Sequence, residues 1–265
     1  MTISAGHRII VALDDINFVD AWDLARKLKG QVTTFKLHEI LDRGGPLTTF
    51  QTFGAVWVDL KVQEPPNKIQ GRLLPYIKQG ADFLTVSSFC WKESMRAAAE
   101  IKGNTKILAV GLLSSLDEKA VREMLMMPLS EYFSPGLLSQ YSPEYIKRMF
   151  ICSDDGFMRR DVIREFARHF ALAAAESGLD GFVCAPYELP ALENIGLPKD
   201  FIKIVTNVRP DGFVLPKDDQ NLNRSATPRE ALDMGADYIV IGSPITKAPD
   251  PLSRVMEIIK EISPA

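Results

Sequence analysis

Short apolar segments recur along the chain, and several of the intervals between them have apolar residues at helical spacing. Eight segments are continuously apolar rather than alternating, as expected for strands that are buried on both faces. They are Arg8–Leu13, Thr33–Leu37, Ala55–Leu60, Phe83–Ser87, Ile107–Leu112, Gly181–Cys184, Ile202–Thr206 and Tyr238–Ile241. Strands of this kind that alternate with helices predict a parallel sheet.

Helices are predicted where apolar residues repeat every three to four positions. The clearest cases are Asp20–Leu28, Lys92–Ile101 and Asp161–Glu176. Asn17 is a plausible cap of the first of these helices. Thr227, Pro228 and Glu230 form a helix-start pattern, with threonine at the cap, proline in the first turn and glutamate three residues after the cap.

Eight strand–helix repeats predict a closed (β/α)8 barrel, and residues 1–265 match the size of one such domain. An open doubly wound sheet is the alternative, but no Gly-x-Gly-x-x-Gly motif follows the first strand. One connection, Ser114–Asp180, is much longer than the others. We interpret residues 128–156, approximately, as an insertion between the fifth and sixth strands. Such an insertion is either a helical excursion on the barrel rim, which we favour, or a lid over a site.

Composition narrows the range of functions. A formal net charge of −3 gives no reason to expect nucleic acid as a partner. Three widely separated cysteines indicate free thiols in a reducing compartment. No apolar stretch approaches the roughly 18 residues of a membrane span, and the N-terminus lacks a signal-peptide pattern. We therefore expect a cytoplasmic protein.

The third apolar segment ends in charged residues. Asp59 and Lys61 alternate with apolar neighbours, so both should lie on one side of the strand, and Glu64 follows before two prolines. Opposite charges at a strand end are costly to bury unless they are paired. In a parallel barrel, catalytic groups occupy that end. A surface ion pair at a strand terminus is the alternative interpretation.

Further motifs follow the same order as in a known family of barrels. They are Ile10–Asp14, a strand ending in an acid; Phe35–Leu37, with a lysine on the second strand; Asp59–Asn67; and the stretch from Arg209 to Thr246, which includes Asp218–Gln220. Together they resemble the orotidine 5'-monophosphate decarboxylase family, whose signature is Asp-x-Lys-x-x-Asp-Ile-Pro-Asn. The resemblance covers almost the whole chain except residues 128–156. The Asp-x-Lys core is shared with sugar-phosphate enzymes, whereas Pro66-Asn67 favours the decarboxylases.

The resemblance implies decarboxylation of orotidine 5'-monophosphate to uridine 5'-monophosphate without a cofactor. Lys61 would stabilise and protonate the C6 carbanion, and Asp59 would face the substrate carboxylate. Lys36 would hold both residues in an array of alternating charges and contact the ribose, and Asp14 would accept a ribose hydroxyl. Glu64 would reach the ribose from the neighbouring subunit, which makes the expected assembly a homodimer.

The resemblance also implies a set of substrate-binding residues beyond the charge array. Ser115 would read the pyrimidine edge, and Gln220 would bridge the base and the phosphate. The loop at Gly242 and Ser243 would receive the phosphate. The remaining members of the set are Asn67 and Lys68, which follow Glu64, and Arg224.

The chain departs from the family at several of these positions. Glu64 replaces an aspartate, Lys68 a threonine and Ser243 the arginine that binds phosphate; His38 and Ser88 stand where we expect glycine and histidine; and Thr206–Arg209 lacks a Pro-Gly turn. Serine cannot replace a bidentate guanidinium.

Two interpretations follow. In the favoured one, the chain is a divergent decarboxylase in which Arg209, Arg224, Lys68 or a residue of the insertion replaces the lost arginine. In the other, the ligand has changed. A magnesium-dependent sugar-phosphate lyase or decarboxylase, with Asp59 and Glu64 at the metal, is one such alternative. A non-catalytic nucleotide-binding protein is the second.

Overall fold

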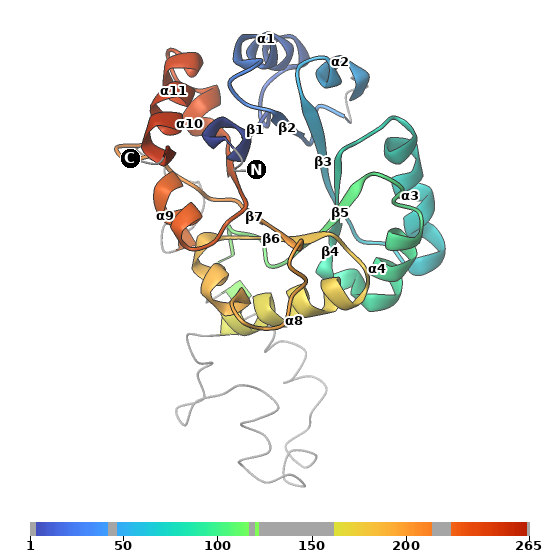
Figure 1. Ribbon diagram of the computed structural model, residues 1–265. Coiled ribbons are helices and arrows are strands. Elements are labelled where there is room, and N and C mark those ends of the chain that lie inside the picture. The colour runs from blue at the N-terminus through green and yellow to red at the C-terminus, as the bar shows by residue number, and fades with distance from the viewer. Residues whose placement is uncertain (1–3, 42–46, 117–119, 122–161, 214–223, 264–265) are drawn as a thin grey trace, which may run out of the picture.

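The strands close into a barrel in a computed structural model that describes residues 4–41, 47–116, 120–121, 162–213 and 224–263 (Figure 1). They are β1 Ile9–Ala12, β2 Thr34–Leu37, β3 Ala55–Val62, β4 Phe83–Ser87, β5 Lys106–Val110, β6 Gly181–Cys184, β7 Ile202–Val205 and β8 Tyr238–Ile241. Each pairs in parallel with the next strand, and β8 pairs with β1. The predicted (β/α)8 barrel is confirmed. The insertion predicted at 128–156 lies outside the described residues.

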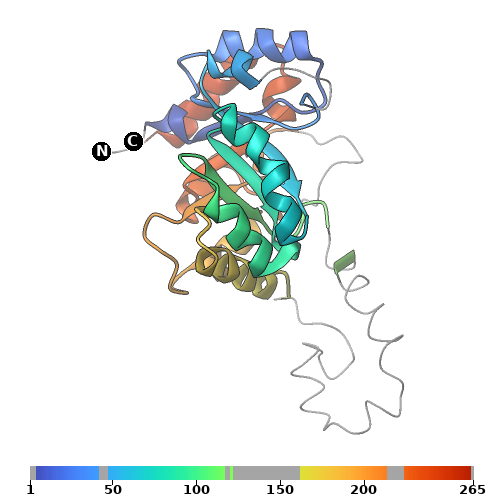
Figure 2. The same cartoon turned by 90° about the vertical axis from the view of Figure 1, so that its right-hand side faces the viewer.

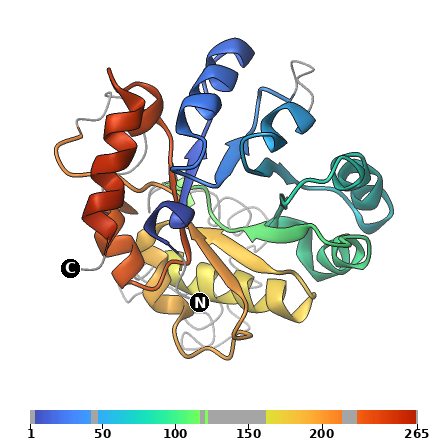
Figure 3. The same cartoon turned by 45° about the horizontal axis from the view of Figure 1, so that its top comes forward.

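Helices surround the strands in an outer ring, which Figure 3 shows most clearly. The α-helices are α1 Phe18–Leu28, α2 Leu47–Gln51, α3 Pro66–Lys78, α4 Trp91–Glu100, α8 Val162–Glu176, α9 Pro228–Asp233, α10 Ser243–Thr246 and α11 Pro251–Ile262, and the 3-10 helices are η1 Ala5–Arg8, η2 Ser88–Cys90 and η3 Pro186–Leu192. α3 and α4 lie side by side on the outside of the barrel (Figure 2). None of the helices in the described ranges is both long enough and apolar enough to span a membrane.

Both predicted helix caps are confirmed. The Asn17 side chain accepts a hydrogen bond from the backbone N–H of Asp20, at the start of α1. At α9, Thr227 Oγ1 accepts from the backbone N–H of Glu230, and the Glu230 carboxylate accepts from the backbone N–H of Thr227. These bonds satisfy donors that the first turn of a helix leaves unpaired.

The strands are buried on both faces, which explains their continuous apolar sequences. In β1, Ile9 and Val11 belong to the large core between strands and helices, whereas Ile10 and Ala12 belong to a smaller cluster inside the barrel. This alternation places every second residue of a strand in the interior. Trp57 of β3 is the largest fully buried member of the inner cluster.

The pairing of β3 with β4 is interrupted where β3 carries its charged residues. Val58 pairs with Leu84 and Val62 with Val86, so β3 advances four residues while β4 advances two. Lys61 lies within this irregularity and has a positive φ of 49°. Irregularities of this kind redirect side chains at barrel rims. Here the redirected part of β3 is the segment with the candidate catalytic residues.

Candidate active site

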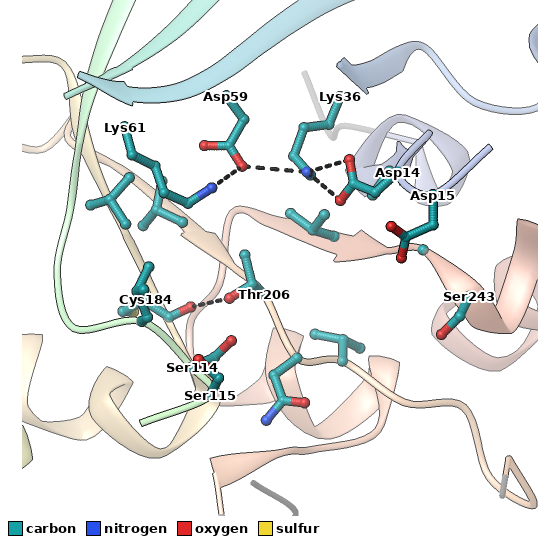
Figure 4. A pocket seen from close by; sticks show the side chains of 18 of the residues that line it. Asp14, Asp15, Lys36, Asp59, Lys61, Ser114, Ser115, Cys184, Thr206 and Ser243 are labelled. Atoms are coloured by element: carbon teal, nitrogen blue, oxygen red, sulfur yellow. Dashed lines mark hydrogen bonds and ion pairs between the residues drawn. The ribbon is translucent and has the colours of Figure 1, made fainter. Parts of the chain in front are cut away.

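A cavity of about 520 Å³ opens at the carboxyl ends of the strands, and Figure 4 shows most of the side chains that line it. Every strand except β4 contributes to its lining, either directly or through the segment that follows it. The polar residues of the lining are Asp14, Asp15, Lys36, Asp59, Lys61, Ser114, Ser115, Thr206, Asn207, Arg209, Ser243, Thr246 and Lys247. This is the end of a (β/α)8 barrel where active sites lie.

Four charged residues form one alternating chain along a wall of the cavity (Figure 4). Lys36 Nζ lies 2.6 Å and 2.8 Å from the two carboxylate oxygens of Asp14. It also lies 3.3 Å from Asp59 Oδ2, which in turn is 2.8 Å from Lys61 Nζ. The side chains of Lys36 and Asp59 are both 6% exposed, whereas Lys61 is 33% exposed and faces the cavity. The sequence expectation that these residues come together is confirmed.

Lys36 and Asp59, the two inner residues of this row of charges, stay ionised. Burial by itself lowers the pKa of Lys36, but the carboxylates of Asp59 and Asp14 outweigh it, so that the pKa lies above its ordinary value. Burial by itself raises the pKa of Asp59, but the ammonium groups of Lys36 and Lys61 outweigh it and hold the pKa below its ordinary value. The site therefore presents fixed charges at neutral pH.

Two side chains hold the irregular end of β3. Thr85 of β4 is fully buried, and its hydroxyl donates to Asp59 Oδ1 at 2.8 Å while accepting from the backbone N–H of Lys61 at 3.0 Å. His38 Nδ1 lies 2.6 Å from the backbone oxygen of Asp59. Because a carbonyl oxygen can only accept, Nδ1 is the donor. These hydrogen bonds, in addition to the pleat of the strand, keep Asp59 and Lys61 on one side of β3.

Across the cavity, the segment after β5 places Ser114 and Ser115 opposite the charged chain (Figure 4). Ser115 was expected there. Arg224 was expected to bind substrate, but it does not line the cavity. Its side chain is 2% exposed and is paired with Glu188 of η3. The structure therefore does not bring Arg224 to the cavity with the other expected residues.

A third region of the cavity follows β7 and β8. Ser243 lies directly after Gly242, and Arg209 Nη1 is 3.4 Å from Ser243 Oγ. Arg209 and Lys247 both line the cavity beside Ser243. Asn207 has a positive φ of 61°, a conformation that asparagine tolerates well. It lies in the segment after β7 where the sequence lacks the expected Pro-Gly.

Several expected residues are not brought to this cavity. Glu64, Asn67 and Lys68 belong to the β3–α3 connection and the first turn of α3, and none of them lines the cavity of this chain. Glu64 is partly buried, whereas Asn67 and Lys68 are exposed. Gln220 lies outside the described residues.

Sequence reasoning did not assign a role to Thr85, Ser114 or Lys247. Thr85 could have been suspected, because a polar residue in the middle of an apolar strand needs a buried partner. Ser114 adjoins Ser115, which was expected at the base, whereas nothing in the local sequence distinguishes Lys247 from an ordinary loop residue. The described part of the chain holds no cluster of three or more His, Cys, Asp or Glu side chains that could hold a metal ion.

Comparisons with known proteins point to one family. A model of the orotidine 5'-phosphate decarboxylase / HUMPS family matches residues 151–258. An orotidine 5'-phosphate decarboxylase of Nitrosococcus oceani is 33% identical over 264 residues, which cover 97% of each chain. One from Moorella thermoacetica is 31% identical and covers 97% of this chain and 93% of the relative. The crystal structure of the Lactobacillus acidophilus enzyme matches 97% of this chain with a TM-score of 0.69 and 26% identity.

Proposed function

The chain belongs to the orotidine 5'-phosphate decarboxylase family, and from this premise we propose that it converts orotidine 5'-monophosphate to uridine 5'-monophosphate and carbon dioxide without a cofactor. The observation that supports this proposal most directly is the alternating chain Asp14–Lys36–Asp59–Lys61 on the cavity wall. An array of fixed charges suits a reaction whose difficulty is the charge that develops in the transition state.

Lys61 is the proposed proton donor. When the bond between C6 and the carboxylate breaks, its electron pair stays on C6 and carbon dioxide leaves. The Lys61 ammonium stabilises this carbanion and transfers a proton to it, and the resulting amine recovers a proton from water. Lys61 suits this role because it lines the cavity and is the more exposed of the two lysines in the charged chain, at 33% against 6% for Lys36.

Asp59 is proposed to lie beside the carboxylate of the substrate. Its own charge is fixed by Lys36, Lys61 and Thr85, so it stays negative next to a second negative group. The repulsion falls as carbon dioxide departs, which favours the transition state over the ground state. Lys36 and Asp14 lie next along the array, and we assign the ribose hydroxyls to them.

The pyrimidine and the phosphate are assigned to opposite ends of the cavity. Ser115, with Ser114, faces Lys61 and suits the base, whereas Gly242 and Ser243 suit the phosphate. Arg209 supplies the cation that Ser243 cannot, since its guanidinium lies 3.4 Å from the Ser243 hydroxyl. Among the three named substitutes that the structure describes, Arg209, Arg224 and Lys68, it is the one that lines the cavity next to Ser243. Gln220 remains a proposed bridge between base and phosphate.

A homodimer is part of the proposal. Glu64 does not line the cavity of its own chain, although it follows Lys61 by three residues. This position suits a carboxylate that reaches the ribose of the neighbouring subunit. Asn67 and Lys68, exposed at the start of α3, would accompany it.

The magnesium-dependent alternative is less well supported. Both carboxylate oxygens of Asp59 already accept from protein groups, Oδ1 from Thr85 and Oδ2 from Lys61. Two ammonium groups beside this carboxylate would repel a divalent cation. Glu64, the other ligand of that alternative, does not line the cavity.

The proposed activity is tested by following the loss of orotidine 5'-monophosphate absorbance with purified protein and no added metal. Wild type should turn the substrate over, and Lys61→Ala should abolish turnover. Lys78→Ala is the matched control, because Lys78 is an exposed lysine of α3. Tight binding of uridine 5'-monophosphate by a wild type that shows no turnover would instead identify a non-catalytic nucleotide-binding protein.

A further inference from the structure

The pair formed by Glu188 and Arg224 is fully enclosed, with each side chain 2% exposed. Glu188 Oε1 accepts from Arg224 Nε at 2.9 Å and from Arg224 Nη2 at 2.6 Å. Glu188 Oε2 accepts from the backbone N–H of Ala185, which follows β6. Burial raises the pKa of Glu188 even with Arg224 beside it. An ion pair so far from water adds little stability by its charge alone.

The remaining nitrogen of the guanidinium binds the segment after β5. Arg224 Nη1 donates to the backbone oxygen of Leu113 at 2.8 Å and to that of Leu116 at 2.7 Å. These two carbonyls bracket Ser114 and Ser115, which line the cavity opposite the charged chain. The planar fork of arginine directs separate nitrogens at the carboxylate and at the two carbonyls, whereas the donors of lysine all lie on one nitrogen.

We propose that Glu188 and Arg224 are positioning residues that hold Ser114 and Ser115 at the base-binding side of the cavity. Glu188 fixes the orientation of the guanidinium, and the guanidinium fixes the two carbonyls on either side of the serines. The pair therefore acts on substrate recognition without touching substrate. This inference rests on the proposed function, because it assigns the serine side of the cavity to the pyrimidine.

Arg229 provides a matched control. Its guanidinium also binds backbone carbonyls, those of Glu261 at 2.7 Å and 3.2 Å and of Ser263 at 2.7 Å, but it joins α9 to the end of α11 and does not line the cavity. Arg224→Lys and Arg229→Lys thus make the same chemical change at two carbonyl-binding arginines. Both variants are expected to melt at a lower temperature than wild type.

The test compares the binding of uridine 5'-monophosphate with that of ribose 5-phosphate, which has no base, by calorimetry on the full chain. Arg224→Lys should weaken uridine 5'-monophosphate binding by about tenfold, the effect of losing about one hydrogen bond between the base and the displaced serines, and leave ribose 5-phosphate binding unchanged. It should also raise KM for orotidine 5'-monophosphate more than it lowers kcat. Arg229→Lys should leave the binding of both ligands unchanged. If Arg224→Lys does not fold, Glu188→Gln carries the same comparison.

The outcomes separate this inference from the proposed function. Selective loss of nucleotide binding in Arg224→Lys supports the positioning role. Equally weakened binding of both ligands, or unchanged binding of both, overturns the positioning role. Turnover by wild type would in that case still support the decarboxylase. A wild type that neither turns over orotidine 5'-monophosphate nor binds uridine 5'-monophosphate overturns both.

Discussion

Lys61 reaches the carboxylate of Asp59, 2.8 Å away, from a backbone conformation that is uncommon for a lysine, with φ at 49°. Residues in sparsely populated conformations cost free energy and persist where surrounding contacts determine them. The supporting contacts here come from Thr85 and His38. The ion pair at the centre of the proposed mechanism therefore depends on residues of β4 and on the end of β2.

Thr85→Val should reduce both stability and turnover. The change keeps the shape of the side chain but leaves the Lys61 N–H and an Asp59 oxygen without their partner, which costs about 1–3 kcal/mol. We expect kcat to fall by about tenfold because the ion pair loses its fixed position. Urea unfolding and steady-state kinetics measure the two effects.

Thr105→Val is the control for this change. Thr105 is also buried, and its hydroxyl donates to the backbone oxygen of Ala81 at 2.7 Å. The Thr105→Val variant should be less stable than wild type and keep the kcat of wild type. Equal kinetic effects of the two substitutions would show that Thr85 acts only through the fold.

His38 should be replaceable by asparagine but not by glutamine. The Asn amide nitrogen can occupy the place of Nδ1, which donates to the Asp59 oxygen, whereas the Gln amide nitrogen corresponds to Nε2. His38→Gln and His38→Ala should lower kcat by about two- to tenfold, the effect of one hydrogen bond. His38→Asn should restore most of it, and steady-state kinetics of the three variants would decide. A glutamine variant as active as the asparagine variant would contradict this assignment.

Arg209→Met should weaken binding of the phosphate specifically. We expect the Kd of uridine 5'-monophosphate to rise by about tenfold or more, because a charge-assisted hydrogen bond is lost, while the Kd of uridine stays unchanged. Adding Ser243→Arg to this variant should recover affinity for the nucleotide. Arg26→Met removes an exposed arginine of α1 and serves as control. A similar rise in the Kd of uridine would argue against a contact between Arg209 and the phosphate.

Acidification should remove stability through Asp59, whose pKa is lowered in the folded protein. Such a group stabilises the fold above its unfolded pKa of about 3.9, and the contribution is lost as the pH falls through the folded pKa. Between about pH 5 and pH 2, wild type should therefore lose more stability than Asp59→Asn. Urea unfolding at a series of pH values measures this slope. Asp23→Asn, at an exposed pair on α1, should leave the slope of wild type intact.

Glu64 should act on the active site of the partner subunit. A mixture of Lys61→Ala and Glu64→Ala, after subunit exchange, contains heterodimers with one site that carries neither change, so activity should return. A mixture of Lys61→Ala and Asp59→Ala is the control, because each of its heterodimer sites keeps one defect. Absence of recovery in the first mixture, with exchange verified by mass spectrometry, would refute action in trans.

The strands were predictable from the sequence because their burial on both faces makes them continuously apolar. The core of the site was predictable too, since Lys36, Asp59 and Lys61 are charged residues at the ends of such segments. The break in β3–β4 pairing was not predictable, because it depends on the hydrogen bonds between Thr85 of β4 and residues Asp59 and Lys61 of β3. The burial of Arg224 was not predictable for a similar reason. Its partner Glu188 lies 36 residues away in the sequence, and a charged side chain gives no local sign of burial.

The charged chain also bears on how this barrel could be altered. The removal of Lys36 and Asp59 from water is a cost met once, when the protein folds, and it does not recur in each catalytic cycle. Apolar side chains of similar volume often stabilise a fold as well as a buried ion pair, or better. Redesign that selects only for thermal stability would therefore be expected to replace these two residues first. The product would be a more stable barrel without catalytic activity.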